Sequence, residues 1–182
     1  VSGGSLSSRI KHYGAYREPM IQHYMKQCLE GLKYMHSKNI IHRDIKSANI
    51  LVDSNNDIKI SDFGISRIED LTQKRASMKG TAYWMAPEIA RGVSGCTTKV
   101  DIWSLGCVAI ELLSGKHPFP NLNPFQAIYH LGLGKLPQLP SKTISTSLKS
   151  FIEACLQVDP GKRSTAEALL QHPFITDPDL KL

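Results

Sequence analysis

Residues 102–110 form the most apolar stretch of the chain, and the helix predicted around them, which Thr97 or Thr98 can cap and which runs through Ser114, restricts the possible folds more than any other feature. A helix here would carry apolar side chains nearly all round, so other elements must cover it on every side. Its uncharged stretch, 102–110, is bounded by Asp101 and Glu111 and is far short of the roughly 20 residues that cross a bilayer. Gly115 ends it. The sequence therefore predicts a buried central helix and no membrane span.

A second helix is predicted over residues 19–35, where Pro19 suits the first helical position. Its apolar residues recur with the 3.6-residue period of a helix that buries one face: Met20, Ile21, Tyr24, Met25, Cys28, Leu29, Leu32 and Met35. Two short β-type runs follow at 50–52 and 58–60, joined by the turn sequence DSNND, and predict a small hairpin. Residues 65–95 show little periodicity and predict a long functional loop.

The rest of the chain has further helix signals. Asn123 followed by proline opens one helix, and residues 146–156 form another. The segment 164–167 has the pattern of a capping box, which opens a last helix that stops before Pro173. With 182 residues, of which 41% are hydrophobic, the chain fits one mainly α domain with a small β-hairpin near its start.

Charge and cysteine content argue against two classes of function. The formal net charge is +6, but the lysines and arginines are scattered, with no basic run and no aromatic interleaving, so we expect no nucleic-acid binding. The four cysteines lie far apart and show no metal-ligand spacing. Buried free thiols in a reducing compartment are the favoured interpretation.

Three short motifs carry chemistry: HRDIKSAN at 42–49, DFG at 62–64 and APE at 86–88. In this order, with a hairpin between the first two and a loop before the third, the sequence resembles the eukaryotic protein kinase family. The resemblance covers essentially the whole chain. It implies the fold of the kinase C-terminal lobe, which is helical with a small β-hairpin carrying the catalytic and DFG loops.

Phosphoryl transfer needs positioning and charge neutralisation, and the first two motifs supply suitable residues. The Asp44 carboxylate can accept the proton of a substrate hydroxyl, and Lys46 directs a cation at the transferring phosphate. Asn49 and Asp62 offer hard oxygen ligands to Mg²⁺. Leu51 resembles the residue that forms the apolar floor under adenine, so the resemblance implies ATP and Mg²⁺ as cofactors. The alternative is that these polar residues merely cap loops.

Residues 62–88 resemble a kinase activation segment, with Thr72, Ser77 and Thr81 as candidate phosphoacceptors. Ser77 fits the family's activating site best, and Arg43 and Arg67 are the cations that would order a phosphate there. We expect Ser77→Ala to lower the activity of a complete enzyme, and unchanged activity would contradict this assignment. The alternative is a solvated serine in a basic loop.

The resemblance also implies contacts that shape the site. Thr81 hydrogen-bonds near Asp44 and Lys46, and the pair of Lys46 with Thr81 resembles serine/threonine kinases. Glu88 forms a buried ion pair with Arg163. Asp101 is buried and accepts backbone N–H groups from the loop that holds His42. The structural roles fall on His42, Phe63, Gly64, Glu88, Asp101 and Arg163.

Residues 80–88 and 99–107 look like mitogen-activated protein kinase kinase kinases, and p21-activated kinases are similar. Ala82 departs from the proline common in that group. The subgroup implies a cytoplasmic enzyme whose protein substrate is a downstream MAP kinase kinase.

The family's nucleotide-binding lobe is not seen in these residues. No GxGxxG loop follows a strand, and no VAIK-like lysine strand occurs. We therefore expect residues 1–182 to be a partial kinase domain, a C-lobe whose N-terminal lobe is absent and which needs a small lobe to complete its ATP site. Two hypotheses follow: a fragment of an active serine/threonine kinase that is inactive alone, or a non-catalytic lobe that binds kinase partners or substrates.

Overall fold

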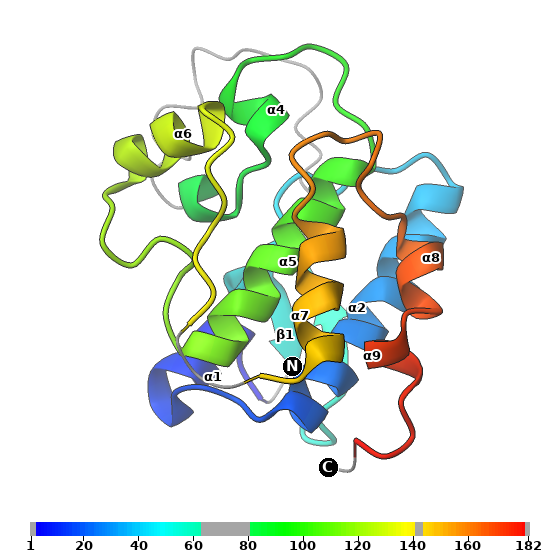
Figure 1. Ribbon diagram of the computed structural model, residues 1–182. Coiled ribbons are helices and arrows are strands. Elements are labelled where there is room, and N and C mark those ends of the chain that lie inside the picture. The colour runs from blue at the N-terminus through cyan, green and yellow to red at the C-terminus, as the bar shows by residue number, and fades with distance from the viewer. Residues whose placement is uncertain (1–2, 63–80, 141–143, 181–182) are drawn as a thin grey trace.

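The fold is built around α5, Lys99–Ser114, whose residues from Val100 to Leu113 are all buried. In the computed structural model, which describes residues 3–62, 81–140 and 144–180, this helix crosses the middle of the molecule (Figure 1). It packs against α2, Glu18–Ser37, and α7, Thr146–Cys155. The buried central helix predicted from the apolar segment is confirmed.

Close packing of α5 on α7 depends on Gly106. A Cβ atom at this position would lie 2.6 Å from the Cβ atom of Cys155, closer than real side chains approach. Gly115 ends α5 in the left-handed conformation, with φ of 73°, and its N–H donates to the carbonyl of Glu111. A residue without a side chain is therefore needed at both positions, for different reasons.

The helix α2 buries the stripe that its sequence predicts, from Ile21 to Met35, against α5 and α8, Ala166–Leu170. It begins at Glu18, one residue before the predicted start, and Pro19 lies in its first turn. A shorter helix, α1, Leu6–Tyr13, precedes it and is capped by Ser5.

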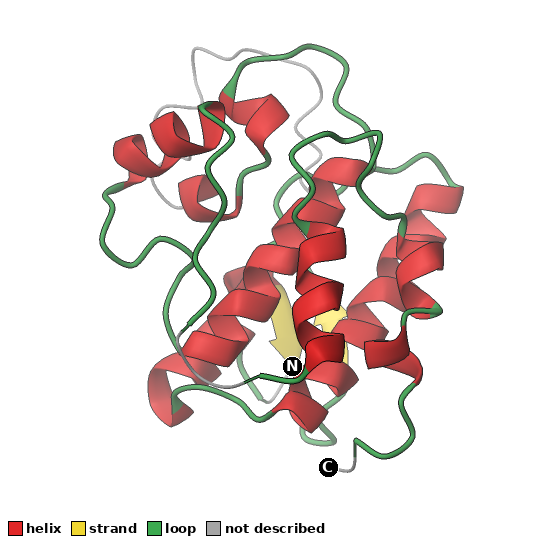
Figure 2. Cartoon of the chain, viewed as in Figure 1, coloured by secondary structure: helices red, strands yellow, loops and turns green. Residues whose placement is uncertain are grey.

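The predicted hairpin is present (Figure 2). Strand β1, Ile50–Val52, pairs antiparallel with β2, Ile58–Ile60, in the register Ile50 to Ile60. The Asp53 side chain closes the turn by accepting the N–H groups of Asn55 and Asp57 at 2.8 and 3.0 Å. This pattern explains why the turn sequence is rich in Asp and Asn.

Two expectations for the helices need correction. The predicted loop 65–95 contains the 3₁₀ helix η2, Ala82–Trp84, and the short helix α4, Pro87–Ala90, in its described part. At the predicted capping box, the cap is Thr165, whose hydroxyl accepts the N–H of Ala168. The helix it opens is not the last, because Pro173 starts α9, Pro173–Thr176. Proline interrupts one helix and suits the first turn of the next.

The remaining predicted helix, α6, Pro124–Gly132, begins at a complete capping box between Asn123 and Gln126.

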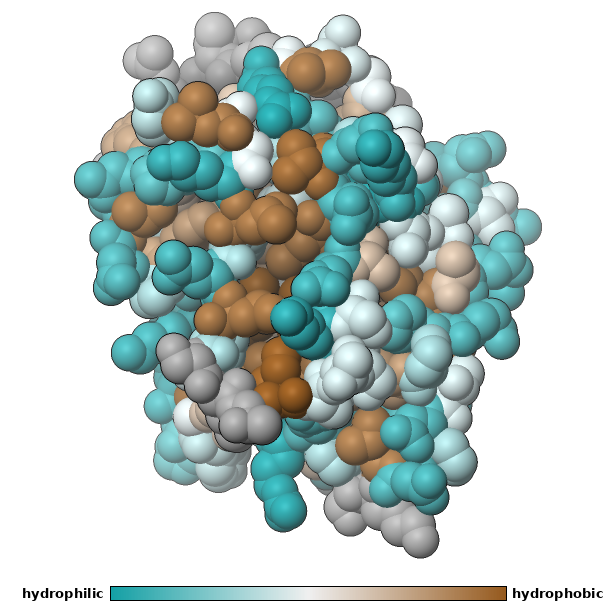
Figure 3. Space-filling view, viewed as in Figure 1, coloured by the Kyte–Doolittle hydropathy of each residue, from teal (hydrophilic) through white to brown (hydrophobic). Residues whose placement is uncertain are grey.

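The surface over α6 is partly apolar, and brown side chains gather there on the face shown in Figure 3. The exposed apolar residues of α6 and the loop after it are Phe125, Tyr129, Leu133 and Leu136. Among the residues that the structure describes, no helix combines the length and apolar character needed to span a bilayer.

The cysteines are free, and three of the four are buried, whereas Cys96 is only partly buried. Burial raises the pKa of Cys28 to about 12 and also raises the pKa values of Cys107 and Cys155 well above their ordinary range. At pH 8 these thiols are therefore almost wholly protonated and unreactive.

We expect a thiol reagent to modify Cys96 alone in the native chain and all four cysteines in denaturant. Rapid modification of a second cysteine without denaturant would contradict the burial.

Candidate active site

Three side chains from two distant segments meet in one hydrogen-bonded group. The Thr81 hydroxyl donates to Oδ1 of Asp44 at 3.0 Å and accepts from Nζ of Lys46 at 3.1 Å. Nζ of Lys46 also lies 3.2 Å from Oδ2 of Asp44. The side chains of Asp44 and Lys46 are 32% and 18% exposed, so the group is sheltered but still open to a ligand. A carboxylate, a cation and a hydroxyl thus lie within bonding distance of one another.

Asn49 fixes the orientation of Asp44. Its side-chain nitrogen donates to the Asp44 carbonyl at 2.8 Å and to Oδ2 of Asp44 at 2.9 Å. Asn49 is buried at the end of the 3₁₀ helix η1, Ser47–Asn49, which leads directly into β1. Because the amide nitrogen is committed to Asp44, the amide oxygen is the atom that Asn49 can offer to a metal ion.

The loop that carries Asp44 is anchored to the central helix. The buried carboxylate of Asp101 accepts the backbone N–H of His42 at 2.9 Å and that of Arg43 at 2.8 Å. These bonds hold Arg43 in the left-handed region with φ of 69°, which is unfavourable for a residue with a side chain. The contact predicted for Asp101 is confirmed. Sequence reasoning missed His36, whose Nε2 lies 2.8 Å from Oδ2 of Asp101.

His42 connects this loop to the end of the hairpin. Its Nε2 bonds the carbonyl of Ser61 at 3.0 Å, and its Nδ1 accepts the N–H of Asp44 at 3.2 Å. A carbonyl can only accept, so Nε2 carries the proton and Nδ1 does not. One neutral imidazole therefore bridges the residue that precedes Asp62 and the residue that carries the candidate catalytic carboxylate.

Asp62 follows β2 and is exposed, with φ of 53°. The preceding residue, Ser61, donates its N–H and its hydroxyl to the carbonyl of Asn49, at 2.8 and 3.1 Å. The backbone thus brings the two predicted metal-ligating residues to the same end of the hairpin. Leu51 is partly buried between two fully buried strand neighbours and so faces away from the core. The candidate residues Phe63, Gly64, Arg67, Thr72 and Ser77 lie outside the described residues.

The donor set fits Mg²⁺ better than a transition metal. Asp62 and the amide oxygen of Asn49 are hard oxygen donors, which Mg²⁺ prefers and to which it commonly adds substrate phosphates. Within residues 3–62, 81–140 and 144–180 there is no group of three or more His, Cys, Asp and Glu side chains placed to hold a metal alone. Asn49 and Asp62 would hold a metal ion together with oxygen atoms of a bound nucleotide.

A buried ion pair ties the segment after Thr81 to the C-terminal helices. Nη1 and Nη2 of Arg163 donate to the two carboxylate oxygens of Glu88 at 2.7 and 2.9 Å. Arg163 also donates to the carbonyls of Gln157 and Lys99, at 2.9 and 2.8 Å, and its guanidinium lies over the ring of Trp103. The predicted contact between Glu88 and Arg163 is confirmed, and all of these partners satisfy a guanidinium that has no access to water.

A second buried carboxylate, Glu111, was not singled out by the sequence. Its Oε1 accepts the hydroxyl of Ser47 at 2.8 Å, and its Oε2 accepts the indole N–H of Trp84 at 3.0 Å. Burial raises the pKa of Glu111, while the two hydrogen bonds and the charge of Lys11 act in the opposite direction. The signal in the sequence was an acidic residue within the apolar second half of α5.

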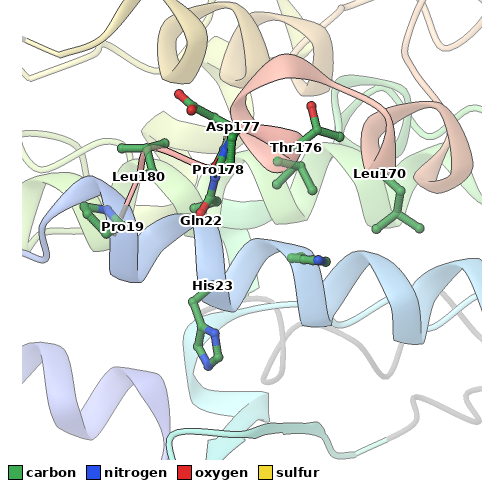
Figure 4. A pocket seen from close by; sticks show the side chains of 10 residues that line it. Pro19, Gln22, His23, Leu170, Thr176, Asp177, Pro178 and Leu180 are labelled. Carbon is green, nitrogen blue, oxygen red and sulfur yellow. Dashed lines mark hydrogen bonds between the residues drawn. The ribbon is translucent and has the colours of Figure 1, made fainter. Parts of the chain in front are cut away.

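A surface hollow of about 520 Å³ lies elsewhere on the molecule (Figure 4). It is lined by the first half of α2, including Pro19, Gln22 and His23, and by the C-terminal segment around Asp177 and Leu180. The loop that carries Asp44 follows the other end of α2, after Ser37. The hollow contains none of the predicted site residues.

Comparison with known proteins agrees with this arrangement. A sequence profile described as the protein kinase domain matches residues 1–175. The chain belongs to the protein kinase family. Among its curated relatives, mitogen-activated protein kinase kinase kinase 3 of Arabidopsis thaliana is 46% identical over 176 residues, which are 96% of this chain and 29% of that protein.

Two yeast kinases are similar to the same degree. Serine/threonine-protein kinase STE11 of Saccharomyces cerevisiae is 45% identical over 179 residues, covering 96% of this chain and 25% of that protein. Serine/threonine-protein kinase BCK1/SLK1/SSP31 of the same yeast is 46% identical over 180 residues, covering 96% of this chain and 12% of that protein. The kinase chain described here thus spans less than a third of the length of each of these relatives.

Proposed function

We propose that this chain is the C-terminal lobe of a serine/threonine protein kinase that transfers the γ-phosphate of ATP to a protein hydroxyl. The observation that carries the proposal is the group formed by Asp44, Lys46 and Thr81, with Asn49 holding the Asp44 carboxylate. This group joins a proton acceptor, a cation and an orienting hydroxyl, which are the parts that phosphoryl transfer requires.

Each residue has a distinct task in this mechanism. The Asp44 carboxylate orients the substrate hydroxyl and takes its proton as the bond to phosphorus forms. Lys46 stabilises the negative charge of the transferred group. Thr81, which bonds both Asp44 and Lys46, fixes the positions of these two side chains relative to each other. Mg²⁺, held by Asn49 and Asp62, would supply charge neutralisation of the phosphates. Leu51 would form the lower surface of the adenine site, and a small lobe would form the upper one.

The names of the relatives support a finer proposal. We infer a MAP kinase kinase kinase of the cytoplasm, because the relative from Arabidopsis thaliana that is 46% identical to this chain carries the name mitogen-activated protein kinase kinase kinase 3. The protein substrate would then be a downstream MAP kinase kinase, phosphorylated on serine or threonine.

The decisive experiment compares two proteins, the 182-residue chain and a chain in which a small lobe precedes it. Transfer of labelled phosphate from Mg·ATP to a catalytically inactive MAP kinase kinase is measured, with phosphoamino-acid analysis of the product. The longer protein is expected to label serine and threonine, and the 182-residue chain to show almost no activity. Labelling of tyrosine alone, or no transfer by the longer protein, would reject the proposed function.

A further inference from the structure

Glu111 contacts both of the segments that supply the candidate catalytic residues, one through Ser47 and the other through Trp84. Ser47, its partner at Oε1, comes directly after Lys46 and begins the 3₁₀ helix that ends at Asn49. Trp84, its partner at Oε2, ends the 3₁₀ helix that begins directly after Thr81. The two partners are 64 and 27 residues away from Glu111 along the chain, so a single carboxylate joins three distant parts of the sequence.

The cost of burying this carboxylate argues that it does more than fill space. Glu111 is 6% exposed, and among the described residues no ion pair neutralises it. A carboxylate without a cation is expensive to bury, and an apolar side chain of similar size would serve the packing of α5 better. What a leucine or methionine could not do is accept one hydrogen bond from each of two separate segments.

We propose that Glu111 is a positioning residue that clamps the catalytic loop to the segment carrying Thr81. Thr81 joins the partly exposed side chains of Asp44 and Lys46, and Glu111 joins the buried residues Ser47 and Trp84. Ser104, which precedes Glu111 on α5, strengthens the attachment of Trp84 to this helix, because its hydroxyl donates to the Trp84 carbonyl at 2.8 Å. The two 3₁₀ helices are thereby fixed to one rigid helix, which sets the distance between their functional side chains.

The clamp has a first test on the 182-residue chain that requires no activity. The sequence has two tryptophans, so the indole N–H region of a ¹⁵N spectrum contains two signals, and Trp84→Phe assigns them. We expect Ser47→Ala to shift the Trp84 indole signal, because the lost hydrogen bond redistributes charge on the carboxylate they share. Ser114→Ala is the matched control, since this serine lies on the same helix as Glu111 and its described hydrogen bonds are local, to the backbone carbonyl and N–H of Lys116. An unchanged Trp84 signal in Ser47→Ala would overturn the clamp.

The second test measures catalysis in the protein that includes the small lobe, and it rests on the proposed function. Glu111→Met is expected to lower kcat at least about 10-fold with little change in KM for ATP, and Glu111→Gln, which can bond both partners, to restore most of it. Breaking either attachment disconnects the two segments. Ser47→Ala and Trp84→Phe together are therefore expected to lower kcat no further than the more harmful of the two alone.

These outcomes separate the two proposals. Additive effects of Ser47→Ala and Trp84→Phe on kcat, or a loss of thermal stability in Glu111→Met with normal kcat, would show that Glu111 is only structural. Absence of phosphate transfer by the unsubstituted protein would instead reject the proposed function, while the indole signals would still decide whether the clamp exists.

Discussion

An Asp44→Asn variant of the complete kinase is expected to transfer phosphate about 10³-fold more slowly than the unsubstituted protein, since a positioned general base contributes about 10²–10⁴-fold. Asparagine has nearly the same shape and can still accept a hydrogen bond from Thr81, but it cannot take the proton of a substrate hydroxyl. The measurement is kcat with a protein substrate, together with the thermal midpoint, which is expected to change little.

Asp57→Asn is the matched control for this prediction. The substitution is chemically the same, since a carboxylate again becomes an amide. Asp57, however, is exposed in the hairpin turn, and its carboxylate accepts a long hydrogen bond of 3.3 Å from Gln27. Its kcat is expected to equal that of the unsubstituted protein. If Asp44→Asn retained more than about a tenth of the activity, Asp44 would not be the proton acceptor.

Arg163→Ala is expected to destabilise the chain by about 3–5 kcal/mol, because it leaves the Glu88 carboxylate buried without its partner. The carbonyls of Gln157 and Lys99 would lose their donors as well. Urea unfolding of the 182-residue chain, followed by circular dichroism, measures the change in free energy. Such a loss is a large part of the stability of an ordinary domain.

The contrasting pair is that of Lys33 with Glu167, which has a similar length of 2.9 Å but side chains that are 48 and 73% exposed. Water screens this pair, so Glu167→Ala is expected to change the free energy of unfolding by less than about 1 kcal/mol. Equal effects of Arg163→Ala and Glu167→Ala would show that burial does not govern the contribution of Glu88 and Arg163.

Local sequence signals predicted much of the fold for clear physical reasons. The stripe of α2 follows the helical period, the nearly unbroken apolar run of α5 predicts a helix covered on every side, and the cap of α6 lies within four consecutive residues. The division between α8 and α9 was missed because the proline that interrupts a helix also suits the start of another. The short helices η2 and α4 were missed because each is only three or four residues long.

The candidate site was predictable where a motif names the residue and unpredictable where only a distant contact does. Asp44, Lys46 and Asn49 lie within six consecutive residues, so the motif places them in one loop. Glu111 and His36 have no motif, and their roles depend on partners that only folding brings near. An acidic residue among apolar neighbours, such as Glu111, indicates a buried polar contact, but the sequence does not identify its partners.

The attachment of His42 and Arg43 to Asp101 has a consequence for how the molecule fluctuates. Loops ordinarily open locally, and their backbone amides exchange with solvent deuterium long before those of the core. Here the two amides donate to a side chain with no exposure, on a helix enclosed by the rest of the protein. We therefore expect the backbone amides of His42 and Arg43 to exchange with deuterium only when the core itself opens, as slowly as those of the central helix.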